Sequence, residues 1–92
     1  MAPAAVHEVR PRIPEGIRSR ITSEIDIPVE VQVNEKGRVA RASAESRDND
    51  GTRRYLATQS VKAARQWRFA PARTAGGQAV AASKTLHFVF RP

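Results

Sequence analysis

Apolar and polar residues alternate most regularly between residues 25 and 34. The apolar positions are Ile25, Ile27, Val29, Val31 and Val33. A period of two is typical of a strand that buries one face. Pro28 lies inside this pattern and has no N–H group for a ladder, so we expect pairing on both sides to begin near Val29.

A hairpin is predicted directly after this strand. Glu35-Lys36-Gly37 is a tight-turn sequence, with Gly37 at the position that needs a positive φ. Residues 38–46 form the return strand. Its apolar positions Val39, Ala42 and Ala44 face inward together only if the alternation skips once, which predicts a β-bulge near Ala40-Arg41.

The longest helical pattern covers residues 53–68. One side carries Leu56, Ser60, Ala63 and Trp67, and the opposite side carries Arg54, Lys62, Arg65 and Arg68. Small residues on the inner side allow the helix to lie close to a sheet, and Pro71 prevents its continuation. The Asp-rich loop before it lacks the ligand spacing of a calcium loop, so we assign turn residues there, with Asp50 or Thr52 as the N-cap.

A shorter helical pattern precedes the first strand. Ile13, Ile17 and Ile21 share a face, and Pro14 suits the first position of a helix of about two turns. Residues 1–9 show no period and are predicted to be a linker arm, followed by a single domain at 10–92. Residues 1–5 look like a start methionine joined to a Pro/Ala linker, which favours a fragment of a longer protein over a cytosolic protein.

The last predicted element is a strand from Gln78 to Phe90, after a flexible turn at 74–77. Val80, Ala82, Leu86, Phe88 and Phe90 occupy its apolar face, which Lys84 interrupts, and Ala81, Ser83, Thr85, His87 and Val89 occupy the other. At about a dozen residues it is the longest strand, spanning ~40 Å, and we expect it to overhang its partner.

These elements predict an α+β fold in the order α-β-β-α-β. Each strand shows one apolar face only, which favours a three-stranded antiparallel sheet with two helices on one face. With the strands in spatial order 2-1-3, the last strand lies at an edge. Apart from Lys84, Arg91 and Pro92 it carries nothing that blunts an edge, so it is either an aggregation hazard or a docking site for an extended peptide.

Composition narrows the chemistry without choosing a partner. The chain has 92 residues, a net charge of +7 and no cysteine, so it has no disulfide frame and no thiolate metal site. The charge permits contact with nucleic acid, anionic lipid or polyanionic cell-wall polymers. Two distant histidines, with no motif joining a nucleophile to a base, argue against an enzyme, a metal site and a cofactor.

Three segments together resemble the C-terminal domain of TonB-type energy transducers. They are the hairpin from Val29 to Val39, the stretch Ala64-Arg-Gln-Trp67-Arg-Phe69-Ala-Pro71-Ala, and Leu86-His-Phe88-Val-Phe90 with Gly76/Gly77 before it. The resemblance covers residues 10 to 91, and the tryptophan-containing stretch is its most specific part.

The resemblance implies a periplasmic domain, anchored to the inner membrane through a segment absent from this chain and driven by an ExbB–ExbD-like proton motor. It implies capture of the TonB-box peptide of an outer-membrane transporter by strand addition. The partner-binding residues would be Ser83, Lys84, Thr85, Leu86, His87, Phe88, Val89 and Phe90. Leu86, Phe88 and Phe90 would hold the strand on the core, while Ser83, Thr85, His87 and Val89 would tune the peptide.

Three alternatives stay open at this point. An envelope scaffold or sensor could share the fold without driving transport. A nucleic-acid-binding domain would fit the basic helix, but we expect no nucleic acid because the outer sheet face lacks aromatics for base stacking. A homodimer through the open edge is also possible, and the sequence does not rank it against a monomer.

Overall fold

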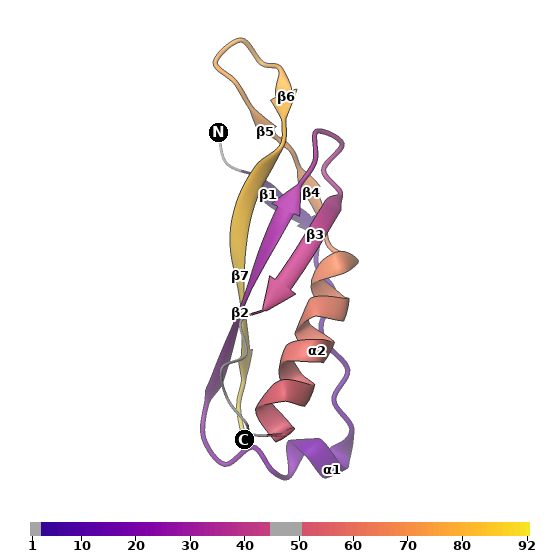
Figure 1. Ribbon diagram of the computed structural model, residues 1–92, viewed down its shortest axis with the longest axis vertical. Helices are drawn as coiled ribbons and strands as arrows, with labels where there is room; N and C mark the ends of the chain where they lie inside the picture. The colour runs from indigo at the N-terminus through magenta and orange to yellow at the C-terminus, as the bar shows by residue number, and fades with distance from the viewer. Residues whose placement is uncertain (1–2, 45–50) are drawn as a thin grey trace.

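The computed structural model describes residues 3–44 and 51–92. Its centre is an antiparallel three-stranded sheet in the order β3-β2-β7, with α2 lying along one face (Figure 1). The elements of this layer pair are β2 (Ile25–Val33), β3 (Val39–Ala44), α2 (Gly51–Arg65) and β7 (Ala82–Phe90). The predicted α+β class, the antiparallel sheet and the edge position of the last strand are confirmed.

The central strand β2 follows its sequence pattern residue by residue. Its odd-numbered side chains are buried or half-buried and its even-numbered ones are exposed. Pairing with β3 begins at Val29, one residue after Pro28, as predicted. The hairpin turn has Gly37 at φ 81°. Gln32 pairs with Arg41 and Val33 with Val39, so Ala40 is the extra residue of the predicted bulge.

Helix α2 covers the sheet with small side chains. Leu56, Ala57, Ser60, Ala63 and Ala64 are its buried residues. They meet the fully buried Val29, Val31 and Val33 of β2 in one continuous core. The alanines and the serine keep the helix close to the sheet, because they place little volume between the two backbones. Of the two predicted N-cap residues, Asp50 lies outside the described residues, and Thr52 lies inside the helix rather than at its cap.

Two helix predictions were wrong in length. The first helix, α1 (Glu15–Arg18), is a single turn rather than two, although Ile21 is buried and Ile13 and Ile17 pack against the core. Helix α2 ends at Arg65, not near Arg68. The N–H groups of Gln66 and Trp67 donate to the carbonyls three residues earlier, and this tightened last turn releases the chain into an extended segment.

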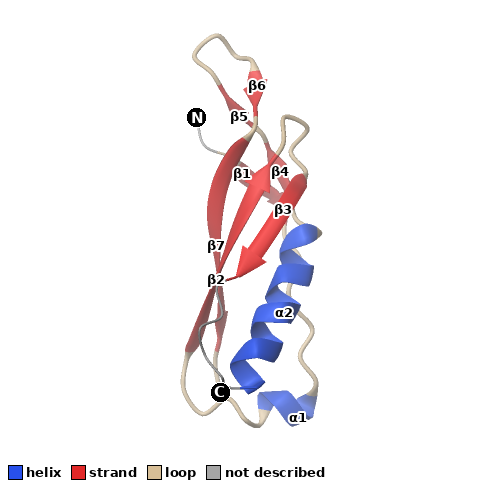
Figure 2. Cartoon of the chain, viewed as in Figure 1, coloured by secondary structure: helices blue, strands red, loops and turns tan. Residues whose placement is uncertain are grey.

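The N-terminal arm contains a short strand that pairs with this extended segment (Figure 2). The arm contains β1 (Ala4–His7), which pairs antiparallel with β4 (Arg68–Ala70). The pairing lets an arm without apolar periodicity satisfy its main-chain groups against the segment that follows the helix. The boundary between arm and domain at residue 10 stays a prediction.

The predicted long last strand is two strands. A small hairpin, β5 (Ala72–Arg73) and β6 (Ala79–Val80), closes through the glycine turn, with Gly77 at φ 84°. The main strand β7 has nine residues, as many as β2, and the two pair from Ile25↔Phe90 to Val33↔Ala82. The expected overhang is therefore wrong, because the extra residues belong to the small hairpin.

Candidate functional site: the outer edge of strand β7

Strand β7 has one partner strand, β2, in the part of the chain that the structure describes. Its register with β2 runs through nine consecutive pairs without a shift. The side of β7 that faces away from β2 is thus an edge without a bulge. The question is which main-chain groups of β7 point outward.

A hydrogen bond in the hairpin answers this question. The N–H of Asn34 donates to the carbonyl of Arg38 at 2.9 Å, so the main-chain groups of Asn34 point toward the β3 side. Successive residues of a strand point these groups to alternate sides. Even-numbered residues of β2 therefore face β3, and odd-numbered ones face β7. The main-chain groups of Pro28 face the β3 side, but pairing with β3 begins only at Val29. The missing N–H of Pro28 therefore costs no hydrogen bond to β3.

The same alternation carries over to β7. Odd residues of β2 are opposite even residues of β7, as in Val29↔Leu86 and Ile27↔Phe88. The even residues of β7 therefore bond to β2. The N–H and C=O groups that point to the outer edge belong to Ser83, Thr85, His87 and Val89.

Side chains along β7 divide in the same way. Leu86, Phe88 and Phe90 are buried against the core. Ser83, Thr85, His87 and Val89 are exposed on the opposite face, and Val89 keeps 46% of its surface open. One set of residues thus anchors the strand, while the other presents both its main chain and its side chains to solvent.

Lys84 does not blunt this edge, contrary to its expected role. Its side chain lies on the inner face, where Nζ donates to the Pro3 carbonyl at 3.1 Å and stands 5.9 Å from the centroid of the Phe69 ring. The ammonium group is used to hold the N-terminal arm. Lys84 therefore belongs to the support of the edge and not to its exposed surface.

His87 makes the only side-chain ion-pair geometry that the described residues show on this strand. Its Nδ1 is 3.1 Å from Oδ2 of Asp26, and both side chains are at least half exposed. An exposed pair of this kind is weak. The arrangement suits a surface contact, since both side chains are open to solvent.

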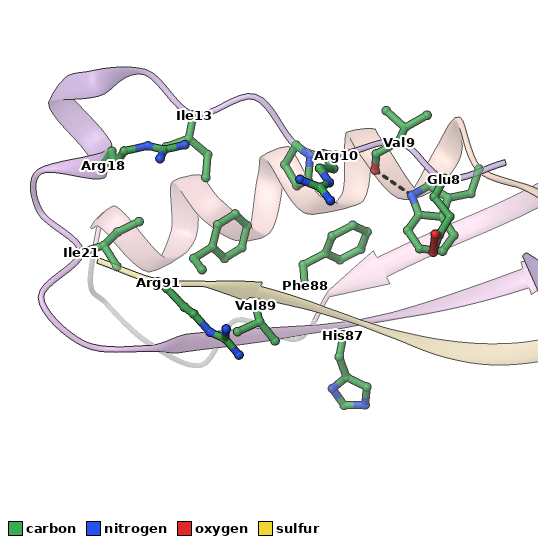
Figure 3. A pocket seen from close by; sticks show the side chains of 13 residues that line it. Glu8, Val9, Arg10, Ile13, Arg18, Ile21, His87, Phe88, Val89 and Arg91 are labelled. Carbon is green, nitrogen blue, oxygen red and sulfur yellow. Dashed lines mark hydrogen bonds between the residues drawn. The ribbon is translucent and has the colours of Figure 1, made fainter.

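A groove of about 450 Å³ borders the edge on the inner side, between β7 and the N-terminal arm (Figure 3). Val9, Arg10 and Ile13 form its upper wall, and Phe88 points into it, whereas His87 points away. The indole Nε1–H of Trp67 donates to the Val9 carbonyl at 2.8 Å and holds the arm in place at Val9. The Trp67 ring also meets Phe88 edge-on, with centroids 5.7 Å apart.

Sequence reasoning missed this wall. It placed the site on residues 83–90 alone and took the arm to be a linker. The signal was present: the only tryptophan needs a partner for its N–H when it is half-buried, and Val9 and Ile13 stand four residues apart before Pro14. These two features indicate that the arm packs on the domain, but they do not indicate that it lies beside β7.

Comparison with known families identifies the domain. The family model for the Gram-negative bacterial TonB protein C-terminal matches residues 10–92. The chain belongs to this family. No curated protein matches it.

The TonB family sets the broad role of the domain. TonB C-terminal domains are periplasmic in Gram-negative bacteria, act in energy transduction and interact with outer-membrane transporters. The family is one of protein-interaction domains and is not an enzyme family. Within residues 3–44 and 51–92, no group of three or more His, Asp or Glu side chains could hold a metal ion. No described helix has the length and apolar character needed to cross a membrane.

Proposed function

We propose that this TonB domain captures a short extended segment of an outer-membrane transporter, the TonB box, by adding it as a strand along the outer edge of β7. The observation that carries the proposal is the set of outward main-chain groups at Ser83, Thr85, His87 and Val89. This row spans about 20 Å, at ~3.4 Å per residue, which is the length of an ordinary strand.

Strand addition suits a domain that transmits force. Main-chain hydrogen bonds lying side by side resist sliding together, and they depend little on the side chains of the captured peptide. Anchoring by Leu86, Phe88 and Phe90 passes the load from β7 into the core. Side chains at Ser83, Thr85, His87 and Val89 then adjust the preference for one peptide over another.

The complete path of force reaches beyond this chain. We propose that an ExbB–ExbD-like motor pulls through an inner-membrane anchor and a spacer that precede residue 1. The same β7 edge would also serve edge-to-edge pairing of two copies. Because both uses need the same main-chain groups, peptide capture and such a homodimer exclude each other.

The test is a titration of a labelled TonB-box-like peptide against proline variants of the edge. Thr85→Pro and His87→Pro each remove an outward N–H while leaving the bonds to β2 in place. Each should abolish measurable capture and leave a cooperative unfolding transition. Ala44→Pro removes an outward N–H from the opposite edge, on β3, and should bind peptide like the wild type.

Peptides methylated at single amide nitrogens sharpen the result. A strand that adds to β7 turns only every second N–H toward it, so methylation should weaken binding at alternate positions and have little effect between them. Capture that survives both β7 prolines, or methylation effects without alternation, would overturn strand addition. A DNA oligomer at two salt concentrations checks the nucleic-acid alternative, whose affinity should fall steeply with salt.

A further inference from the structure

A second groove, of about 360 Å³, lies between helix α2 and strand β3. Its floor is apolar and small-chained, with Ala57 buried and Ala44 and Val61 half-buried. Its rim is mainly basic, formed by Arg54, Lys62 and Arg65 together with the exposed Thr58. The proposed capture at β7 uses none of these residues, so the groove is a feature with no assigned role.

The rim cations have no anionic partner among residues 3–44 and 51–92. Arg54, Lys62 and Arg65 are exposed, and their side chains make no ion pair or hydrogen bond in the described parts of the chain. In the part of the chain that the structure describes, no carboxylate lines the groove. Like charges collected on one helix face repel each other, and nothing in the described packing requires them there, so an external anionic group would relieve the repulsion.

We propose that this groove binds a short acidic segment of a partner protein in an extended conformation. Carboxylates of the segment would pair with the rim, and apolar side chains between them would enter the floor. The distance along α2 from Arg54 to Arg65 is about 16 Å, at ~1.5 Å per residue. An extended peptide covers that length with about five residues, and its alternating sides suit a rim and a floor at once.

The floor is the reason to favour a peptide over a flat polyanion. A duplex or an anionic lipid surface would meet the rim cations but would leave the recessed floor of Ala44, Ala57 and Val61 unused. A segment that alternates Glu with Val satisfies both parts. The groove also flanks β3, the edge of the sheet opposite β7, so this ligand and a strand on β7 would not compete.

Binding can be measured with a dye-labelled octapeptide of alternating Glu and Val, by fluorescence anisotropy on the whole chain. Two companions separate the contributions: alternating Glu and Ser keeps the charge without the apolar side chains, and alternating Lys and Val reverses the charge. We expect the Glu–Val peptide to bind at least about tenfold more tightly than the Glu–Ser peptide, since valine burial is strongly favourable. The Lys–Val peptide should not bind.

Variants of the protein locate the site. The triple change Arg54→Gln, Lys62→Gln and Arg65→Gln should weaken the Glu–Val peptide at least about tenfold, as expected for three exposed ion pairs. Val61→Thr keeps the shape of the floor but makes it polar, and should weaken Glu–Val without changing Glu–Ser. The matched control Arg12→Gln, Arg20→Gln and Lys36→Gln removes the same charge from other exposed positions and should bind like the wild type.

Three results would overturn the proposal. One is equal binding of the Glu–Val and Glu–Ser peptides, and another is an equal loss in the control triple variant, which would reduce the effect to net charge. The third is binding to phosphatidylglycerol vesicles that is tighter than binding to the Glu–Val peptide and is insensitive to Val61→Thr. That result would make the face a lipid contact. A TonB-box-like peptide titrated in parallel should be unaffected by the α2 triple variant, so failure here and failure of capture at β7 are distinguishable.

Discussion

The two edges of the sheet are built differently. Strand β3 has six residues, a bulge at Ala40 and an exposed arginine at position 41, and Arg38 just before it forms a bridge with Arg68. Strand β7 has nine residues, an unbroken register and no exposed lysine or arginine within its span. Both edges belong to one small domain, yet only β3 carries the devices with which proteins discourage strand addition.

The contrast shows that the β7 edge is open because of where the lysines and arginines lie, and not because the chain has too few of them. The chain has 16 lysines and arginines, enough to charge both edges. The one cation inside β7, Lys84, is turned to the inner face and bonded to Pro3. The strand that would be expected to need protection is therefore the one left unprotected, which is the pattern of a docking edge.

The largest expected effect is on the free energy of unfolding, when proline is introduced at position 86 rather than at position 87. Leu86→Pro removes a ladder bond to β2 and a buried side chain, and should cost at least about 4 kcal/mol, from a lost strand bond and a core truncation together. His87→Pro lies next to it but points its nitrogen outward, so it should retain most of the stability and lose capture.

Urea unfolding of the two variants measures this difference in the free energy of unfolding. The comparison of edges would fail if His87→Pro were as unstable as Leu86→Pro, because the outer side of β7 would then already be paired in the free protein.

A change at the turn tests the β3 side. In Gly37→Ala the added Cβ would run into the carbonyl of Phe69, at a positive φ that alanine resists. We expect a loss of about 2–4 kcal/mol from strain and displacement of β4, with β7 still able to bind peptide in the folded fraction. Thermal unfolding and peptide titration check the two parts. Full stability in this variant would show that the turn does not pack on β4.

A smaller effect is expected at the wall of the β7 groove. Trp67→Phe removes the indole donor to Val9 while retaining the aromatic contact with Phe88. The cost should be about 1 kcal/mol, the usual worth of one hydrogen bond, and the amides of β1 should exchange faster. Trp67→Phe with unchanged exchange in residues 4–7 would mean that the arm is held by its pairing with β4 alone.

The sequence predicted the features that repeat or that depend on a special backbone. Alternation from Ile25 to Val33 fixed a strand and its buried face, Gly37 marked the turn, and the broken alternation at Ala40 located the bulge. The edge position of residues 83–90 followed from the order of elements, since a hairpin followed by a crossover leaves few antiparallel arrangements.

What the sequence could not supply is pairing between short segments far apart in the chain. Strands β1, β4, β5 and β6 have two to four residues each, too few for a period to be seen. The pairing of Ala4 with Ala70 depends on where the helix stops, and that end is set by local hydrogen bonds and not by apolar spacing. The groove wall was missed for the same reason.

The most direct test of the β7 edge is amide hydrogen exchange, resolved by residue, with and without a TonB-box-like peptide. Free protein should show fast exchange at Ser83, Thr85, His87 and Val89 and slow exchange at Leu86 and Phe88, whose N–H groups bond to β2. Peptide should slow the first set and leave the second unchanged. Protection of the odd-numbered amides in the free monomer, or no change on adding saturating peptide, would contradict the account.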